Sequence, residues 1–202
     1  MLSQRRGFRD TCGAEMVAMP IILLALFAFG APTKDEVRLQ PFVSGALGAD
    51  WLVGRGVSAI GSVEGGVNYG TPTWGGDIFL RPSGELGTGL QGGQIDLVGR
   101  VGVRRPAWAL YGGLLGRFDS YRESFASVGA GLPITLTLGS EELYGFGEVI
   151  PSLSSARGVE IEGKAGGGLR FKTWAWEGRL SARTFGGSLS LSPQFSVSYY
   201  GF

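Results

Sequence analysis

The sequence predicts an all-β fold whose strands follow one another along the chain. Apolar and polar residues alternate with period two in several segments, which places them on opposite faces of a strand. Turn-forming pairs such as Arg105-Pro106 and Gly139-Ser140 separate these segments. After residue 31, no stretch carries an apolar stripe with the period of a helix. We therefore expect residues 31–202 to form one all-β domain.

The first thirty residues predict an export signal. Three arginines form its basic start: Arg5, Arg6 and Arg9. The uncharged and mostly apolar run Met16–Gly30 has 15 residues, fewer than the roughly 20 that a membrane-spanning helix needs. Ala28 and Gly30 place small residues at the −3 and −1 positions of a cleavage site. We expect residues 1–30 to be a cleavable signal helix, with a retained membrane anchor as the alternative.

Three segments show the alternation most clearly: 57–69, 95–104 and 159–171. In each, one face is apolar or glycine, and the charged residues lie on the other face. Weaker candidates for strands are 37–49, 76–86, 107–118, 125–138, 142–150, 174–184 and 191–202. At about 21 residues for each strand with its connection, the chain after residue 30 holds eight strands, and membrane barrels have even numbers. We predict eight strands, with ten as the alternative.

The length of the strands distinguishes a membrane barrel from a soluble sandwich. The three clearest segments alternate over about 9–13 residues, whereas strands of soluble proteins average about 5–6. A tilted strand needs about 9–11 residues to cross a bilayer. Aromatic residues flank the expected strand ends, as in the girdles of membrane barrels: Trp51, Tyr69, Trp74, Trp174, Trp176, Tyr199, Tyr200 and Phe202. These features favour a membrane-spanning antiparallel up-and-down β-barrel.

Closure of the sheet follows from the solvent. A strand in hydrocarbon cannot leave backbone N–H and C=O groups unpaired, so the sheet must have no edge. The 37 glycines suit such a sheet because tightly curved strands need close backbone approach. The alternative is a glycine-rich soluble β-protein, secreted and adhesive.

The end of the chain resembles the last strand of small outer-membrane β-barrel proteins of Gram-negative bacteria. In that family the last strand ends in Phe, alternate apolar residues precede it, and the assembly machinery recognises it; Tyr200 and Phe202 match these positions. Ser196 and Ser198 fall where apolar residues belong, and a bulge next to Tyr200 would restore the register. The resemblance implies the bacterial outer membrane as location, and its lipid and the barrel-assembly machinery as partners.

Composition excludes several chemistries. The chain has no His and a single cysteine, Cys12, so Ser-His-Asp and Cys-His catalysis, His-ligated metals and disulfides within the chain are excluded. The net charge of +1 gives no attraction to nucleic acid. The glycine string at residues 163–168 lacks the Gly-Lys-Ser/Thr ending of a phosphate loop. A Ser62–Glu64 pair is the catalytic alternative that we weigh, but we expect no enzyme, no cofactor and no metal.

The polar faces of the strands predict a charged lumen. Its expected side chains are six acids and six bases: Glu64, Asp96, Arg100, Arg104, Glu148, Glu160, Glu162, Lys164, Arg170, Glu177, Arg179 and Arg183. A selective pore would show an excess of one sign, whereas balanced charges fill a narrow lumen by pairing with one another.

These charges predict a non-enzymatic barrel with a filled lumen and a structural or surface-interaction role. Specific recognition would then lie in extracellular loops near residues 50–55, 85–93, 119–124 and 151–157. The alternative function is a narrow channel for small or apolar molecules.

Overall fold

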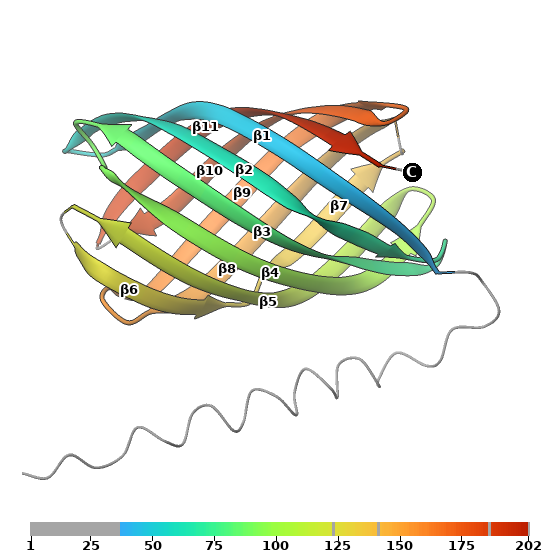
Figure 1. Cartoon of the computed structure of the whole chain (residues 1–202), viewed down its shortest axis with the longest axis horizontal. Coiled ribbons are helices and arrows are strands. Elements are labelled where there is room, and N and C mark those ends of the chain that lie inside the picture. The colour runs from blue at the N-terminus through green and yellow to red at the C-terminus, as the bar shows by residue number, and fades with distance from the viewer. Residues whose placement is uncertain (1–36, 123, 141, 186, 202) are drawn as a thin grey trace, which may run out of the picture. The chain divides into compact units, whose positions relative to one another are not determined.

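The chain closes into an antiparallel β-barrel in the computed structural model, which describes residues 37–122, 124–140, 142–185 and 187–201 (Figure 1). The strands of this part of the chain are β1 Arg38–Leu52, β2 Gly56–Gly70, β3 Trp74–Gly87, β4 Gly92–Arg105, β5 Trp108–Tyr121, β6 Ser124–Gly131, β7 Ile134–Gly139, β8 Leu143–Ser154, β9 Gly158–Phe171, β10 Trp174–Phe185 and β11 Ser188–Tyr200. Neighbours in sequence pair with one another except for β6 and β7, and the first strand pairs with the last, from Phe42–Tyr200 to Leu52–Ser190. The predicted signal, residues 1–30, lies outside the described residues.

Two of these strands share one place in the barrel wall. Strands β6 and β7 lie end to end, since both pair with β5 on one side and with β8 on the other. The break falls at Leu132–Pro133 because proline has no N–H to donate to the ladder. The prediction of one strand over 125–138 therefore matches one crossing of the wall made of two strands.

The barrel wall therefore has ten strand positions, one of which β6 and β7 share, and the chain runs from one end of the barrel to the other ten times. The eight-strand prediction is wrong, and the alternative of ten is the observed number. The error came from the connections, because each crossing with its turn takes about 16 residues between Arg38 and Tyr200 instead of about 21. All ten segments that the alternation singled out become crossings, including 76–86, where Pro82 points outward and the strand continues past it.

The connections between successive strands are short. We call the end with the start of β1 and the finish of β11 the terminal end, and the opposite end the distal end. The distal turns are residues 53–55, 88–91, 122–123, 155–157 and 186–187; the terminal turns are 71–73, 106–107, 140–142 and 172–173. Gly54, at φ 80°, occupies the left-handed region that a tight turn requires. The four segments predicted to hold recognition loops all lie at the distal end, and strand residues make up half or more of each.

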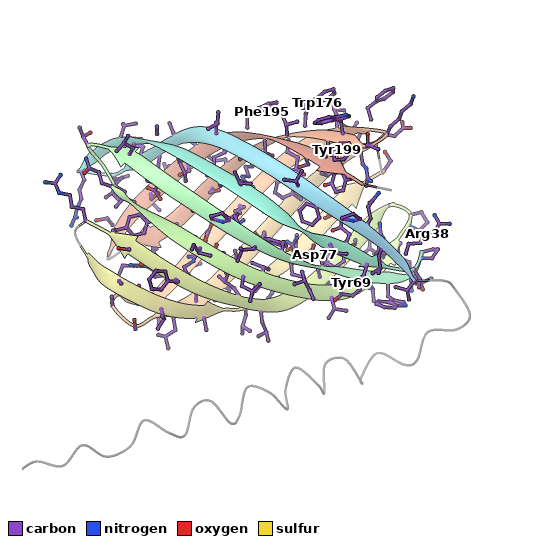
Figure 2. The ribbon with its side chains drawn as sticks, viewed as in Figure 1. Arg38, Tyr69, Asp77, Trp176, Phe195 and Tyr199 are labelled. Atoms are coloured by element: carbon purple, nitrogen blue, oxygen red, sulfur yellow. The ribbon has the colours of Figure 1, made fainter. Side chains whose placement is uncertain are left out.

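The wall is inverted relative to a soluble protein. Large apolar side chains point outward and are exposed, Leu47, Leu86 and Val159 each to 75%, while polar side chains point inward and are buried (Figure 2). Of the charged residues in the described strands, one occupies an outward position: Arg105, at the terminal end of β4. Such an apolar outer belt is stable against lipid but not against water. The alternative of a soluble secreted protein is therefore wrong. The described residues contain no helix that is long and apolar enough to span a membrane.

The aromatic residues gather mainly at one end of the belt. Outward-facing rings at the terminal end are Tyr69, Trp74, Trp108, Phe171, Trp174, Trp176 and Tyr199. Ring centroids lie 5.1 Å apart in the Trp174–Tyr199 pair and 6.1 Å apart in the Tyr69–Trp74 pair. These rings form an interfacial girdle at the level of the terminal turns. Trp51 lies at the distal end.

The last strand keeps its register without a bulge. Tyr200, Tyr199 and Ser198 pair in unbroken succession with Phe42, Val43 and Ser44 of β1. Ser196 and Ser198 are buried in the lumen, and the outward positions are Phe195, Val197 and Tyr199, so the expected bulge is wrong (Figure 2). Tyr200 faces inward, and Phe202 lies outside the described residues.

Candidate functional site: the barrel lumen

All twelve charged residues predicted for the lumen occupy inward positions of their strands. The strands set this placement, because side chains two residues apart share a face. The structure also places inward six strand charges that the sequence analysis missed: Asp50, Asp77, Arg81, Glu85, Arg117 and Asp119. The same alternation would have found four of them if it had been followed through the weaker segments 76–86 and 107–118, whereas Asp50 and Asp119 lie just past the predicted ends of their strands.

A continuous series of ion pairs crosses the middle of the lumen. We call it the central ion-pair chain; its members in order are Asp77, Arg100, Glu148, Lys164, Glu162, Arg117, Asp96, Arg81 and Glu64. The N–O distances between successive members are 2.7–3.2 Å, except for 3.9 Å between Arg81 and Glu64. Its members come from strands on opposite sides of the barrel, so the chain ties the walls together across the lumen.

Asp96 is the most enclosed member of this chain. Its side chain is fully buried and accepts hydrogen bonds from Arg81, Arg117 and Gln94, at 2.8–3.1 Å. Arg117 reaches onward to Glu162 at 2.9 Å. Charge-assisted hydrogen bonds of this kind offset the cost of burying ions away from water.

A second cluster closes the wall next to a distal turn. Arg157, from turn 155–157, donates two hydrogen bonds to Asp119, at 2.8 and 2.7 Å, and two to Glu160, at 2.6 and 3.4 Å. The hydrogen bonds to Asp119 raise the pKa of the Arg157 guanidinium above its ordinary value. The alternation predicted Glu160 in the lumen. It could not predict Arg157, because a turn residue is not part of the inward–outward alternation of a strand.

Apolar packing closes another part of the distal end. Leu90, from turn 88–91, folds inward and packs with Leu52 and Tyr121, and all three are buried. The Ser58 hydroxyl and the backbone of Leu90 exchange hydrogen bonds of 2.7 Å that hold this turn in place. Turns 88–91 and 155–157 therefore cover part of the distal end of the lumen with Leu90 and Arg157.

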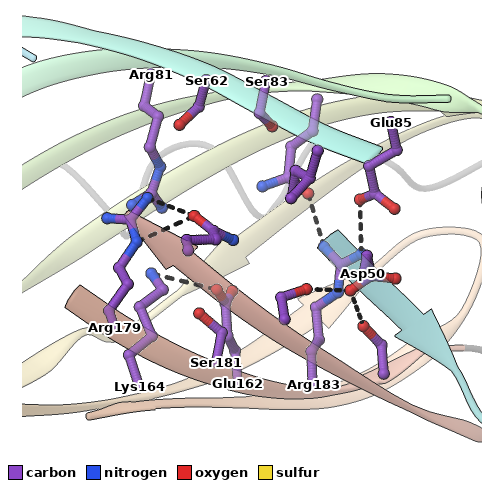
Figure 3. Close-up of a pocket in the computed structure, with 15 residues that line it drawn as sticks. Asp50, Ser62, Arg81, Ser83, Glu85, Glu162, Lys164, Arg179, Ser181 and Arg183 are labelled. Atoms are coloured by element: carbon purple, nitrogen blue, oxygen red, sulfur yellow. Dashed lines mark hydrogen bonds and ion pairs between the residues drawn. The ribbon is translucent and has the colours of Figure 1, made fainter. Parts of the chain in front are cut away.

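The lumen is not completely filled, and two of its cavities differ in size and in lining residues. The smaller, of about 50 Å³, lies toward the distal end among Asp50, Glu85, Arg183 and neighbouring side chains (Figure 3). The larger, of about 190 Å³, is lined by inward residues of the terminal half of the strands, including Asn68, Tyr144 and Tyr200. Arg81, Lys164 and Arg179 line both cavities and separate them.

Four predicted lumen charges do not join an ion pair with any residue of the described part of the chain: Arg104, Arg170, Glu177 and Arg179. Arg170 stacks on the Tyr200 ring, 4.2 Å from its centroid, and donates to Gln40. Glu177 accepts a 2.6 Å hydrogen bond from the Tyr144 hydroxyl. Arg183 pairs with Glu85 at 3.6 Å.

The described residues hold no cluster of three His, Cys, Asp or Glu side chains that could bind a metal ion. In the same part of the chain, Ser62 and Glu64 share no hydrogen bond. What the lumen offers instead is paired charge, two cavities and an apolar cluster of Phe79, Val98, Leu115 and Ile150.

Comparison with known proteins supports the fold. The β-domain of the Bordetella autotransporter BrkA is similar, with a TM-score of 0.50 and 10% identity, over 80% of this chain and 98% of that chain. For the translocator domain of the autotransporter NalP from Neisseria meningitidis, the TM-score is 0.41 and the identity 12%, over 92% of this chain and 95% of that chain. For the attachment invasion locus protein Ail of Yersinia pestis, the TM-score is 0.36 and the identity 10%, over 82% of this chain and 99% of that chain. No protein-family model matches the sequence, and no curated protein sequence does.

The likeness to the BrkA β-domain and the apolar outer belt agree with each other. Together they confirm the predicted resemblance: the described residues form a transmembrane β-barrel of the bacterial outer-membrane type.

Proposed function

We propose that this protein is a non-enzymatic barrel with a closed lumen that serves as a structural element of the outer membrane. The observation that carries the proposal is the central ion-pair chain, which spans the lumen from Asp77 to Glu64. A structural role is favoured over surface recognition because the turns offer two to four residues each and project little beyond the wall.

The energetics of the ion pairs support a lumen that stays closed. Removing one partner from a buried ion pair costs about 3–5 kcal/mol, since the other charge is left uncompensated. A solute wide enough to pass would have to separate several pairs at once, around Arg100, Lys164 and Arg117. At the distal end it would also have to displace the buried side chain of Leu90. Acids and bases are near balance along this path, so no ion is attracted into it.

Conductance in planar bilayers tests the proposal. The protein is refolded in detergent, its fold is verified by heat-modifiable migration on gels, and it is inserted into the bilayer. We expect no steady single-channel currents from the natural sequence. A variant that removes two members of the central ion-pair chain, Arg117→Ala with Glu162→Ala, should conduct if it folds. Steady currents from the natural protein would overturn the closed lumen and favour the narrow channel instead.

A further inference from the structure

The larger cavity owes its space to small side chains on the first and last strands. Ser44 of β1 and Ser198 of β11 line the cavity side by side, since they are direct partners in the sheet. Opposite them, larger side chains such as Phe79 and Leu115 complete the wall. The resulting volume is about 190 Å³. A cavity of about 150 Å³ is enough for benzene, so this one is large enough for a small organic molecule.

Three charged side chains that line this cavity make no hydrogen bond to an opposite charge within the described part of the chain. Arg179 donates from Nε and Nη2 to Gln194, at 3.0 and 2.7 Å, and to no carboxylate. Glu177 accepts from the hydroxyls of Tyr144 and Ser196, at 2.6 and 3.4 Å.

The third of these side chains is Glu64. It lies 3.9 Å from Arg81, beyond hydrogen-bond distance, and Arg81 itself is engaged by Asp96 at 2.8 Å. The cavity therefore holds a guanidinium and two carboxylates that make no hydrogen bond to an opposite charge among the described residues.

The cavity also has an apolar side. Phe79, Val98, Leu115 and Ile150 form a buried cluster, with Phe42 packed against it, and all five line the cavity. Water in contact with this side gains few hydrogen bonds, so displacing it with an apolar group is favourable. The half-exposed Tyr144, Tyr200 and Asn68, on the terminal side, allow solvent to reach the cavity.

We propose that the larger cavity binds a small zwitterion of the α-amino-acid class with an apolar side chain. Arg179 would hold the carboxylate, Glu64 and Glu177 the ammonium group, and the cluster around Phe79 the side chain. A ligand with a single charge would leave the opposite charge of the cavity without a partner, at a cost in affinity. Leucine, with about nine non-hydrogen atoms, has the size that such a cavity accepts. The inference is independent of the closed lumen, because a ligand can occupy a cavity that leads nowhere.

Calorimetric titration of the folded protein in detergent tests this with three ligands of matched shape. L-leucine carries both charges, isocaproate lacks the ammonium group, and isoamylamine lacks the carboxylate. We expect leucine to bind at least about tenfold tighter than either, which is about 1.4 kcal/mol. No binding of leucine at millimolar concentration, or equal binding of isocaproate, would overturn the proposal; the latter would indicate a simple anion site at Arg179.

Two variants assign the charges. Arg179→Gln should weaken leucine and isocaproate about tenfold or more and leave isoamylamine unchanged, and Glu64→Gln should weaken leucine and isoamylamine and leave isocaproate unchanged. Glu85→Gln is the matched control, because Glu85 lines the smaller cavity, and it should bind all three ligands like the natural protein. If every ligand were weakened equally by both cavity variants, the assignment would be wrong. The ligand series on the natural protein stays decisive if a variant fails to fold.

Discussion

The two faces of the barrel wall obey opposite rules although the same strands supply both. On the outer face, Val63 lies exposed among other apolar side chains and makes no directional contact. On the inner face, Asp96 is fully buried and accepts hydrogen bonds from three other side chains. The outer face therefore needs only apolar side chains that suit the surrounding lipid, and it tolerates any apolar side chain of moderate size. The inner face is stabilised by specific ion pairs and hydrogen bonds between side chains, so it tolerates few substitutions.

The largest expected effect comes from breaking the inner face. Asp96→Ala removes the carboxylate that Arg81 and Arg117 share and leaves two buried guanidinium groups short of a partner. We expect a loss of about 3–5 kcal/mol in the free energy of unfolding, measured by urea titration in lipid vesicles. Glu142→Ala, at an exposed residue of turn 140–142, is the control and should change stability by less than about 0.5 kcal/mol. Equal effects of the two variants would show that the central ion-pair chain adds nothing.

The next effect breaks the outer face. Val63→Arg places a charge on the lipid side near the middle of β2, and the cost at the bilayer midplane is about 2–4 kcal/mol. Val57→Arg, on the same face but next to distal turn 53–55, should cost about 0–1 kcal/mol. The same urea titration measures both. If the two positions cost the same, the belt would not have the depth profile of a bilayer.

The sequence predicted the faces much better than the contacts. Parity alone placed Glu162 and Lys164 inside, because a side-chain period of two is a local property of the strand. It could not show that Glu162 meets Arg117 from the far side of the barrel, since cross-lumen partners depend on strand count, tilt and register. The two serines of β11 illustrate this limit: Ser196 and Ser198 looked misplaced in a terminal strand, but both are buried in the lumen, where Ser196 donates to Glu177 and Ser198 lines the larger cavity.

Turns were the other weakness of the sequence analysis. A turn residue such as Leu90 or Arg157 lies outside any alternation, so nothing in the sequence indicates that it folds into the lumen. The eight-strand count failed for a related reason, because it allowed for connections longer than the two to four residues observed.

The distal cluster tests whether a turn residue can matter as much as a strand residue. Arg157→Ala removes the partner that Asp119 and Glu160 share at the distal end. We expect a loss of about 2–3 kcal/mol, less than for Asp96→Ala, because the loss of a charged hydrogen-bond donor next to the barrel rim is partly compensated by water. Urea titration gives the magnitude. Ala156→Ser, at an exposed residue of the same turn, is the control and should lose less than about 0.5 kcal/mol. A loss below about 1 kcal/mol for Arg157→Ala would mean that the turn contributes little to closing the lumen.

The smallest expected effect concerns the terminal turn 172–173, outside both faces. Lys172 has φ 55°, in the left-handed region that costs a side-chain-bearing residue about 1–2 kcal/mol. Its ammonium group also lies 5.4 Å from the centroid of the Phe171 ring, a contact worth about 0.5–1 kcal/mol at an exposed site. Lys172→Gly relieves the first and loses the second, so its stability should stay within about 0.5 kcal/mol of the natural protein. Lys172→Ala loses the ring contact and keeps the strain, so it should be about 1 kcal/mol less stable than the glycine variant. Equal stability of the two variants in urea titration would show that this turn carries no backbone strain.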